Sequence, residues 1–198
     1  MTTASNQFNL VYLSHDLAGD VYDLFHKTHS KPAITMCNYA LTVGDEWHEF
    51  LPYDVLRYKD DWLDDSSEFI SVRDDMAYTR GKLIGACSVN TPVGRFSEKG
   101  IYELTRICFL DTWKPANNTQ RKFFSRFIRE IMDDWVSITG AKKFVTYIHH
   151  NQSGKYLEYA GFQCDKICRY SPNHKGWSTR PGRGKGDLIT KKRFIREV

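Results

Sequence analysis

Two histidines stand where a strand-like run gives way to a short polar link and a small helix-like segment, within residues 142–162. The run FVTYI is β-branched and aromatic, which favours a strand, and His149 and His150 close it. Imidazole titrates near neutral pH and suits proton transfer. Strand residues alternate between faces, so His149 should share a face with Tyr147 while His150 faces away. His149 and Tyr147 are therefore candidate catalytic residues, with ordinary packing or surface roles as the alternative.

The segment YELTR, residues 102–106, supplies a second pair of candidates. Residues 101–111 alternate as a strand does, which predicts Glu103 and Thr105 on one face and Arg106 on the other. A carboxylate in an otherwise apolar strand is costly to bury without a partner. We interpret Glu103 as a base or substrate clamp; an internal ion pair or a solvent-facing position is the alternative.

His26 and His29 lie three residues apart, which places them on one helical face if the helix extends that far. Two imidazoles at that spacing permit joint metal ligation. The sequence offers no third ligand nearby, so the metal is left undecided. The alternative is that His29 and Ser30 meet a substrate where the helix ends.

The C-terminal extension, residues 171–198, is basic and begins rich in glycine. Residues 169–198 hold nine basic and two acidic side chains, although the whole chain carries a net charge of only +4. Arginine binds phosphate bidentately and aromatic rings stack on bases, so DNA is the expected partner and a merely solvated tail the alternative. The candidate substrate-binding residues here are Tyr170, Trp177, Arg180, Arg183 and Lys185.

An acidic, aromatic insertion is expected at residues 44–80. Between Asp45 and Asp75 there are eleven acidic and three basic residues, interspersed with tryptophan, tyrosine and phenylalanine. A disordered linker would carry fewer aromatics, so the insertion should form short elements of its own. Residues 1–198 are expected to form one domain.

Strands and helices alternate along the chain, which predicts an α/β sheet of mixed direction flanked by helices. Expected strands cover 8–13, 37–43, 82–90, 101–111, 142–148, 162–170 and 188–195. Expected helices cover 17–29 with Asp16 as cap, 120–136 with Asn118 or Thr119 as cap and Gly140 as stop, and 153–162. The stripe expected to bury the second helix is Phe124, Phe127, Ile128, Ile131 and Trp135.

The cellular setting is expected to be cytoplasmic. The chain has five cysteines without a CxxC pair, which is typical of reduced thiols. Neither a secretory signal nor an apolar run long enough to span a membrane is present in the sequence.

The second half of the chain resembles the GNAT acyltransferase fold through IYELTRICF, the helix after it, and FVTYIHHNQSGKYLEYAGF. One branch is more similar still: the Mom-type phage DNA-modification enzymes. ELTRI resembles their strand ELSR, TYIH their serine-tyrosine strand end, and GWSTRPGRGKGDLITKKRF their glycine- and arginine-rich stretch with a final RF. Upstream, THSKP and LIGACSVNTP resemble two further segments of that family.

The resemblance implies transfer of a carbamoylmethyl-type group to the N6 amine of adenine in phage DNA, which protects it from restriction nucleases. It also implies a location in the host cytoplasm. Arg106 matches the family's strand arginine and Tyr147 its strand tyrosine, while His149 stands in place of an aspartate. Leu157 occupies the position of the helix tyrosine, and Tyr156, which precedes it by one residue, is the remaining candidate catalytic residue.

The segment TWKPANNTQRKF, residues 112–123, bears on the donor. Typical GNAT enzymes hold the pyrophosphate of acyl-coenzyme A on a glycine-containing loop at this helix start, and no glycine is present here. We therefore expect an unidentified activated donor in place of ordinary acetyl-CoA, with Asn118 and Arg121 binding an anion. Two alternatives stay open: a GNAT-type N-acyltransferase on another amine, and a non-catalytic nucleic-acid-binding protein. The sequence leaves the oligomeric state undetermined.

Overall fold

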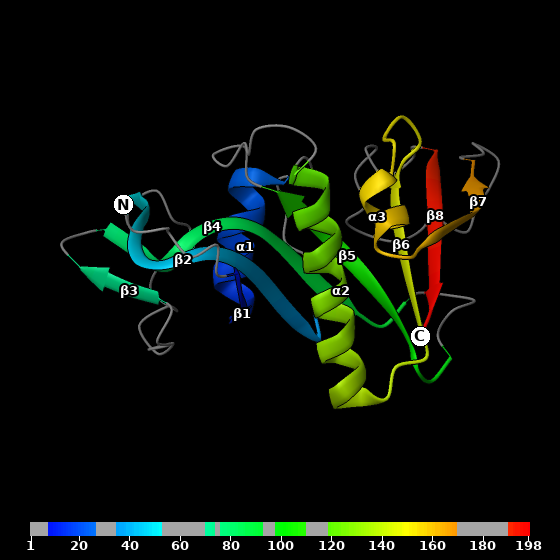
Figure 1. Ribbon diagram of the computed structural model, residues 1–198, viewed down its shortest axis with the longest axis horizontal. Helices are drawn as coiled ribbons and strands as arrows, with labels where there is room; N and C mark the ends of the chain where they lie inside the picture. Colours follow the sequence, from blue (N-terminus) through cyan, green and yellow to red (C-terminus); the bar gives the residue numbers. More distant parts are fainter. Residues whose placement is uncertain are drawn as a thin grey trace, which may run out of the picture.

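A computed structural model describes residues 8–26, 35–52, 70–73, 76–92, 98–109, 119–169 and 190–198. These residues form a mixed sheet in the order β1-β2-β4-β5-β6-β8-β7, with β3 paired to β4 (Figure 1). β5 and β6 run parallel, and the other described pairs are antiparallel. The predicted α/β sheet of mixed direction is confirmed. The elements are β1 (Phe8–Leu13), α1 (His15–Phe25), β2 (Cys37–Pro52), β3 (Ile70–Arg73), β4 (Met76–Asn90), β5 (Ile101–Phe109), α2 (Thr119–Thr139), β6 (Lys143–His149), α3 (Lys155–Tyr159), β7 (Gln163–Cys168) and β8 (Lys191–Glu197).

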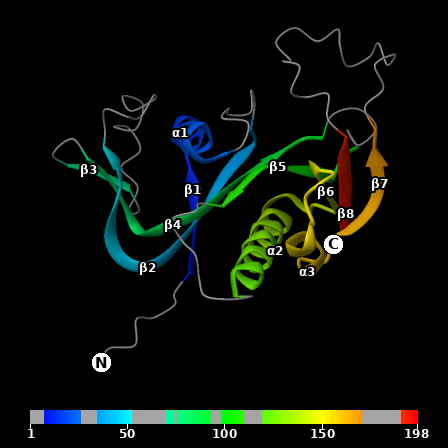
Figure 2. The ribbon, with the colours of Figure 1, turned by 90° about the horizontal axis from the view of Figure 1, so that it is seen from above.

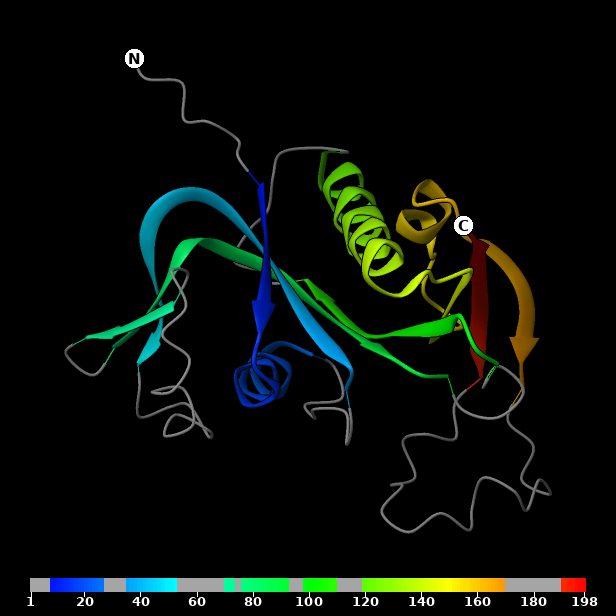
Figure 3. The same cartoon turned by 90° about the horizontal axis from the view of Figure 1, so that it is seen from below.

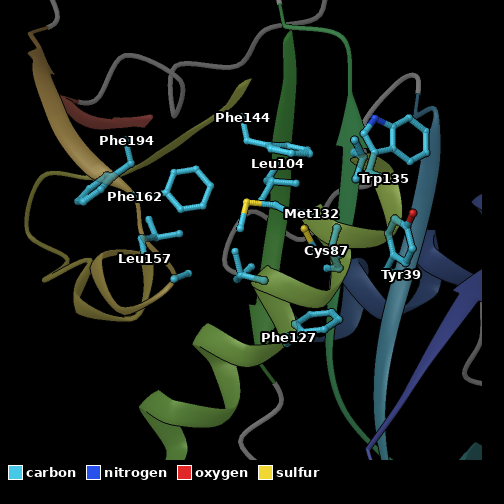
Figure 4. Close-up of a cluster of buried hydrophobic side chains, with 14 of the residues drawn as sticks. Tyr39, Cys87, Leu104, Phe127, Met132, Trp135, Phe144, Leu157, Phe162 and Phe194 are labelled. Carbon is cyan, nitrogen blue, oxygen red and sulfur yellow. The ribbon is translucent and has the colours of Figure 1, made fainter. Parts of the chain in front are cut away.

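Helices cover both faces of the sheet. Figures 2 and 3 show α1 on one face and α2 with α3 on the other. The predicted stripe of α2 is confirmed, because Phe127, Ile128 and Ile131 are fully buried and Phe124 and Trp135 nearly so. Burying each such side chain contributes roughly 1.5–3 kcal/mol relative to leaving it exposed. Figure 4 shows the core that results, where α2 and α3 meet the sheet at Tyr39, Cys87, Leu104, Phe127, Met132, Trp135, Phe144, Leu157, Phe162 and Phe194.

Helix α1 begins and ends earlier than the sequence predicts. Its N-cap is Ser14, whose Oγ accepts a hydrogen bond from the Leu17 N–H at 3.2 Å, so the expected cap Asp16 lies inside the helix. The helix ends at Phe25, and His26 is already extended. The helix does not extend to residue 29, which was the condition for His26 and His29 to share a helical face. His29 lies outside the described residues.

β2 and β4 are longer than predicted and take up both ends of the segment 44–80. The prediction ended the first of them at Val43, because acidic residues follow. The strand tolerates them because Asp45 is exposed and pairs with Arg80 of β4 at 2.7 Å. A register shift between Val43 and Trp47 marks the irregularity that the sequence shows as a break in alternation. Residues 53–69 lie outside the described part.

Candidate active site

Two parallel strands separate in the middle of the sheet. The β5–β6 ladder runs from the pair Ile101 and Lys143 to the pair Leu104 and Thr146. Beyond it β5 continues to Phe109 and β6 to His149, with no ladder between them in the described residues. Figure 1 shows the two strands diverging toward their C-terminal ends. We call this region the opening, defined by residues 105–109 of β5 and 147–149 of β6.

A bulge at Arg106 marks the start of the opening. Ser88 pairs with Thr105 and Ala86 with Cys108, so β5 has one residue more than β4 between these pairs. Arg106 has φ 53°, the one positive φ found for a non-glycine residue in the described chain. Such a conformation costs of order 1–3 kcal/mol and persists only where the surrounding structure holds it.

The bulge interrupts the alternation of β5 at Arg106. Leu104 before it and Ile107 after it pack against the core under α2, whereas Cys108 packs against the cluster covered by α1, on what we call the α1 face. The placement of Arg106 opposite Glu103 and Thr105 stays a prediction, because the extra residue interrupts the alternation from which it follows.

Glu103 and Tyr147 lie on this α1 face beside the opening. Their strand neighbours Leu104 and Ile148 pack into the α2 core, so alternation places the two polar side chains on the opposite side. Burial raises the pKa of the half-buried Tyr147, the negative charge of Glu103 raises it further, and Arg193 lowers it. The structure thus brings these two predicted residues together.

Arg193 and Asp165 complete this polar group, and the sequence analysis missed both. Arg193 on β8 stands directly opposite Tyr147 in the β6–β8 ladder. Its Nε lies 2.9 Å and 3.1 Å from the two carboxylate oxygens of Asp165, and its Nη2 also donates to Asp165. The alternation of LITKKRFI places Arg193 on the face opposite Phe194, which could have identified Arg193. The bulge that presents Asp165 leaves no such sequence signal.

His149 ends β6 opposite Lys191 of β8. Its N–H donates to Gln152 Oε1 at 3.0 Å, and its carbonyl accepts from the Gln152 N–H at 3.0 Å. Alternation places its side chain on the face of Tyr147, half-buried, whereas His150 is exposed. The backbone of His149 is therefore fixed at the rim of the opening.

Tyr156 borders the opening from the α2 and α3 side. Its ring meets Phe109, the last residue of β5, edge-on at 5.7 Å between centroids, and Phe109 stacks on Phe124 at 3.3 Å. Burial, followed by the proximity of Cys87, raises the pKa of Tyr156 above its usual range. Leu157 is fully buried in the core, so the phenol next to the end of β5 belongs to Tyr156.

Several predicted substrate-binding residues cannot be placed. Arg121 lies in the first turns of α2, where the structure describes the backbone alone. The others fall outside the described residues, namely His29, Ser30, Asn118, Tyr170, Trp177, Arg180, Arg183 and Lys185.

Within the described residues, no group of three or more histidine, cysteine, aspartate or glutamate side chains is placed to hold a metal ion. None of the described helices is long and apolar enough to cross a membrane.

The arrangement of the sheet around the opening is that of the GNAT N-acetyltransferase fold. A protein from Acinetobacter baylyi described as an acetyltransferase superposes with a TM-score of 0.52 at 12% identity, over 100% of this chain and 95% of its own. Spermidine/spermine N-acetyltransferase from Vibrio cholerae gives 0.51 at 10% identity, covering 96% and 92%. Ribosomal-protein-alanine N-acetyltransferase from Brucella melitensis gives 0.50 at 11% identity, covering 96% and 99%. No protein-family model and no curated protein sequence matches the chain.

Proposed function

We propose that the protein is an N-acyltransferase that joins an acyl group to an amine at the opening between β5 and β6. The observation that carries the proposal is the placement of proton-handling groups on both sides of the opening. Glu103 and Tyr147 lie on the α1 face, and Tyr156 lies on the face of α2 and α3. The GNAT acetyltransferase fold supports this reading.

The donor is proposed to lie along β5. Beyond Leu104 the described β5 has no ladder with β6. The backbone edge of β5 that faces the opening therefore suits hydrogen bonding to an extended group containing amides, such as the arm of an acyl thioester. A bound donor of this kind supplies an activated acyl carbon. Residues 110–118 lie outside the described part.

The residues of this chain move the protons. Glu103 takes a proton from the acceptor amine, whose nitrogen then bonds to the acyl carbon. Tyr156 gives a proton to the group that leaves as its bond to that carbon breaks. Since burial raises the pKa of Tyr156, its phenol keeps its proton at neutral pH and is able to donate it.

A second candidate function is modification of the N6 amine of adenine in DNA by a carbamoylmethyl-type group. The cations of β7 and β8 favour a phosphate-bearing substrate. Lys191 of β8 pairs with His149, and Lys166 of β7 pairs with Arg193, which in turn pairs with Tyr147. The resemblance of ELTRI and of residues 176–194 to the Mom-type enzymes supports the same reading.

One experiment separates the two functions. The purified full chain is incubated with a panel of acyl-coenzyme A thioesters and amines, and acylated products are sought by mass spectrometry. In parallel, nucleosides are analysed from plasmid DNA of bacteria that express the protein. An acylated small amine or peptide supports the N-acyltransferase, and a new adenosine species supports DNA modification. Failure of both assays with folded protein contradicts both.

A further inference from the structure

We propose that Phe109 is a positioning residue whose ring holds the Tyr156 phenol at the opening, and that Gly85 provides the space in which this ring lies. Phe109 acts on the reaction through Tyr156, which in the proposed function gives a proton to the leaving group, so the proposal rests on that function. Phe109 itself carries no group that binds or moves a proton.

Helix α3 is too short to fix Tyr156 by itself. It has five residues, Lys155–Tyr159, and its N-cap Gly154 makes no side-chain hydrogen bond to the first turn. Helices of this length are unstable without packing, so contacts with other elements decide where their side chains lie. Leu157, fully buried in the core, fixes one side of α3. Tyr156 precedes it and lies about 100° away around the helix, so Tyr156 needs a contact of its own.

Phe109 provides that contact from the end of β5. Its ring meets the Tyr156 ring edge-on, with centroids 5.7 Å apart and ring planes at 85°. Edge-to-face pairs at this distance are favourable and fix the relative orientation of the two rings. Because Phe109 is the last residue of β5, the phenol takes its position from the strand that borders the opening.

The Phe109 ring is itself held by two residues of α2. It stacks on Phe124 with centroids 3.3 Å apart and ring planes at 19°, and it meets Phe127 at 6.4 Å and 70°. Both α2 side chains are buried. The Phe109 ring therefore has little freedom to move, and it links the position of Tyr156 to that of α2.

Gly85 of β4 is the cross-strand partner of Phe109. A Cβ added at Gly85 would lie 3.0 Å from Phe109 Cδ1 and 3.1 Å from the Cys108 carbonyl oxygen. Carbon atoms pack best at about 3.5–4.0 Å, so a side chain at residue 85 would displace the ring. The ring stacked on Phe124 leaves little room for such a movement. The missing side chain of Gly85 thus allows Phe109 to lie where it contacts Tyr156.

A double-mutant cycle tests whether Phe109 acts through Tyr156. We would measure kcat and KM of the full chain for Phe109→Leu, Tyr156→Phe and the double variant, with the amine and thioester found by the product screen. Phe109→Leu should lower kcat about tenfold with little change in KM, because the phenol is misplaced while the substrates still bind. In the Tyr156→Phe background the same change should cost less than about twofold, since no hydroxyl is left to position.

A second measurement needs no substrate. The full chain is labelled with ¹³Cζ-tyrosine, and the Tyr156 signal is assigned with Tyr156→Phe. Its titration is followed by NMR from about pH 9 to pH 11, around the ordinary tyrosine pKa of about 10. Burial raises the pKa of Tyr156 above this range, so its signal should not titrate in the wild type. In Phe109→Leu it should begin to titrate, because the released phenol gains contact with water.

Phe8→Leu is the matched control. The Phe8 ring contacts Phe123 of α2 at 4.5 Å between centroids, and its strand β1 lies at the edge of the described sheet, away from the opening. Its loss should leave kcat and the Tyr156 titration unchanged. If Phe109→Leu does not fold, Gly85→Ala replaces it in both measurements, with a smaller effect in the same direction.

Additive losses of kcat in the cycle would overturn the proposal. So would an unchanged Tyr156 titration in folded Phe109→Leu, or in Gly85→Ala where that variant replaces it. If the wild type forms no product, the proposed function fails, and the NMR titration alone decides whether Phe109 holds the phenol.

Discussion

Tyr156 of α3 meets Phe109 at the end of β5 edge-on, with ring centroids 5.7 Å apart and ring planes at 85°. Edge-to-face contacts at this distance are favourable, so the short helix is fixed against the strand that borders the opening. The phenol therefore lies at the opening through a contact that the sequence does not show, because residues 109 and 156 belong to separate elements.

Replacing Tyr156 by phenylalanine keeps this ring contact and removes the hydroxyl. If the phenol donates a proton to the leaving group, kcat should fall about 10²-fold, within the range of general acid catalysis. The measurement is steady-state kinetics with the amine and thioester found by the product screen. Tyr159→Phe is the matched control, since Tyr159 is 60% exposed on the same helix and should keep full activity. Equal loss in both variants would contradict the role of Tyr156.

Glu103→Gln removes the proposed base with little change in shape. We expect kcat/KM to fall about 10²-fold, because the amide cannot take the proton from the amine. The same kinetic assay measures this change, with circular dichroism to confirm the fold. Glu98→Gln is the control, because Glu98 is exposed next to the start of β5. Retained activity in Glu103→Gln would exclude Glu103 as the base.

The alkaline stability of the protein should depend on Asp134. Tyr12 and Tyr39 both donate to Asp134 Oδ2 at 2.7 Å, which joins β1 and β2 to α2. Hydrogen bonding to Asp134, followed by burial, raises the pKa of Tyr12 to about 12 from 10.0. A raised pKa gives stability that is complete below pH 10 and is lost as the pH rises toward 12.

Thermal unfolding between pH 9 and 12 measures this loss. Tyr12→Phe should give a shallower decline of the unfolding free energy with pH, because one group that titrates differently in the folded state is gone. Tyr159→Phe should leave the decline unchanged. A decline of wild-type steepness in Tyr12→Phe would contradict the assignment.

Asp165 should make the stability of the protein fall as the pH is lowered, the opposite of the effect of Tyr12 in alkali. The hydrogen bond from Arg193 lowers the pKa of Asp165 below 3.8. A lowered pKa gives stability that is present above the unfolded value and is lost as the pH falls through the folded one. Urea unfolding from pH 6 to pH 2 should therefore show a steeper loss below about pH 4 in the wild type than in Asp165→Asn. Identical slopes would show that the Asp165–Arg193 ion pair, screened by solvent, contributes nothing measurable to the free energy of unfolding.

Gly154 should tolerate no side chain. It is the N-cap of α3 with φ 71°, and a Cβ there would lie 2.5 Å from the ring of Phe194 and 3.0 Å from Ile148. Gly154→Ala should destabilise the protein by about 3 kcal/mol or more, since both backbone strain and a core clash result. Gly140→Ala is the matched control: its φ is 66° with nothing within 4 Å, so it should lose only about 1–2 kcal/mol. Denaturant unfolding compares the two, and equal losses would contradict the clash.

The elements with strong periodicity could be predicted from the sequence. The buried stripe of α2 and the strand, turn and helix around His149 follow from local spacing. The neighbourhood of Glu103 and Tyr147 does not, because it depends on the pairing of β5 with β6. The bulge at Arg106 could not be predicted, because it depends on pairing with β4 and on a left-handed conformation that arginine rarely adopts.

The helix cap of α1 and the end of β2 were also predicted wrongly, because both depend on contacts between separate elements. Ser14 and Asp16 both suit an N-cap, and the residue that caps the helix is Ser14, which directly follows the end of β1 at Leu13. The extension of β2 past Val43 depends on Arg80 of the neighbouring strand, which pairs with Asp45 at the exposed end. The Asp165–Arg193 pair likewise needs a bulge whose position no local pattern encodes.

The most direct test of the central claim compares product formation by four variants of the full chain. Acylated amine is quantified by mass spectrometry for Glu103→Gln and Tyr156→Phe, and for their controls Glu98→Gln and Tyr159→Phe. The account predicts product from the wild type and both controls, and a loss of about 10²-fold in the two site variants. Wild-type product yield in folded Glu103→Gln and Tyr156→Phe would show that acyl transfer does not occur at the opening between β5 and β6.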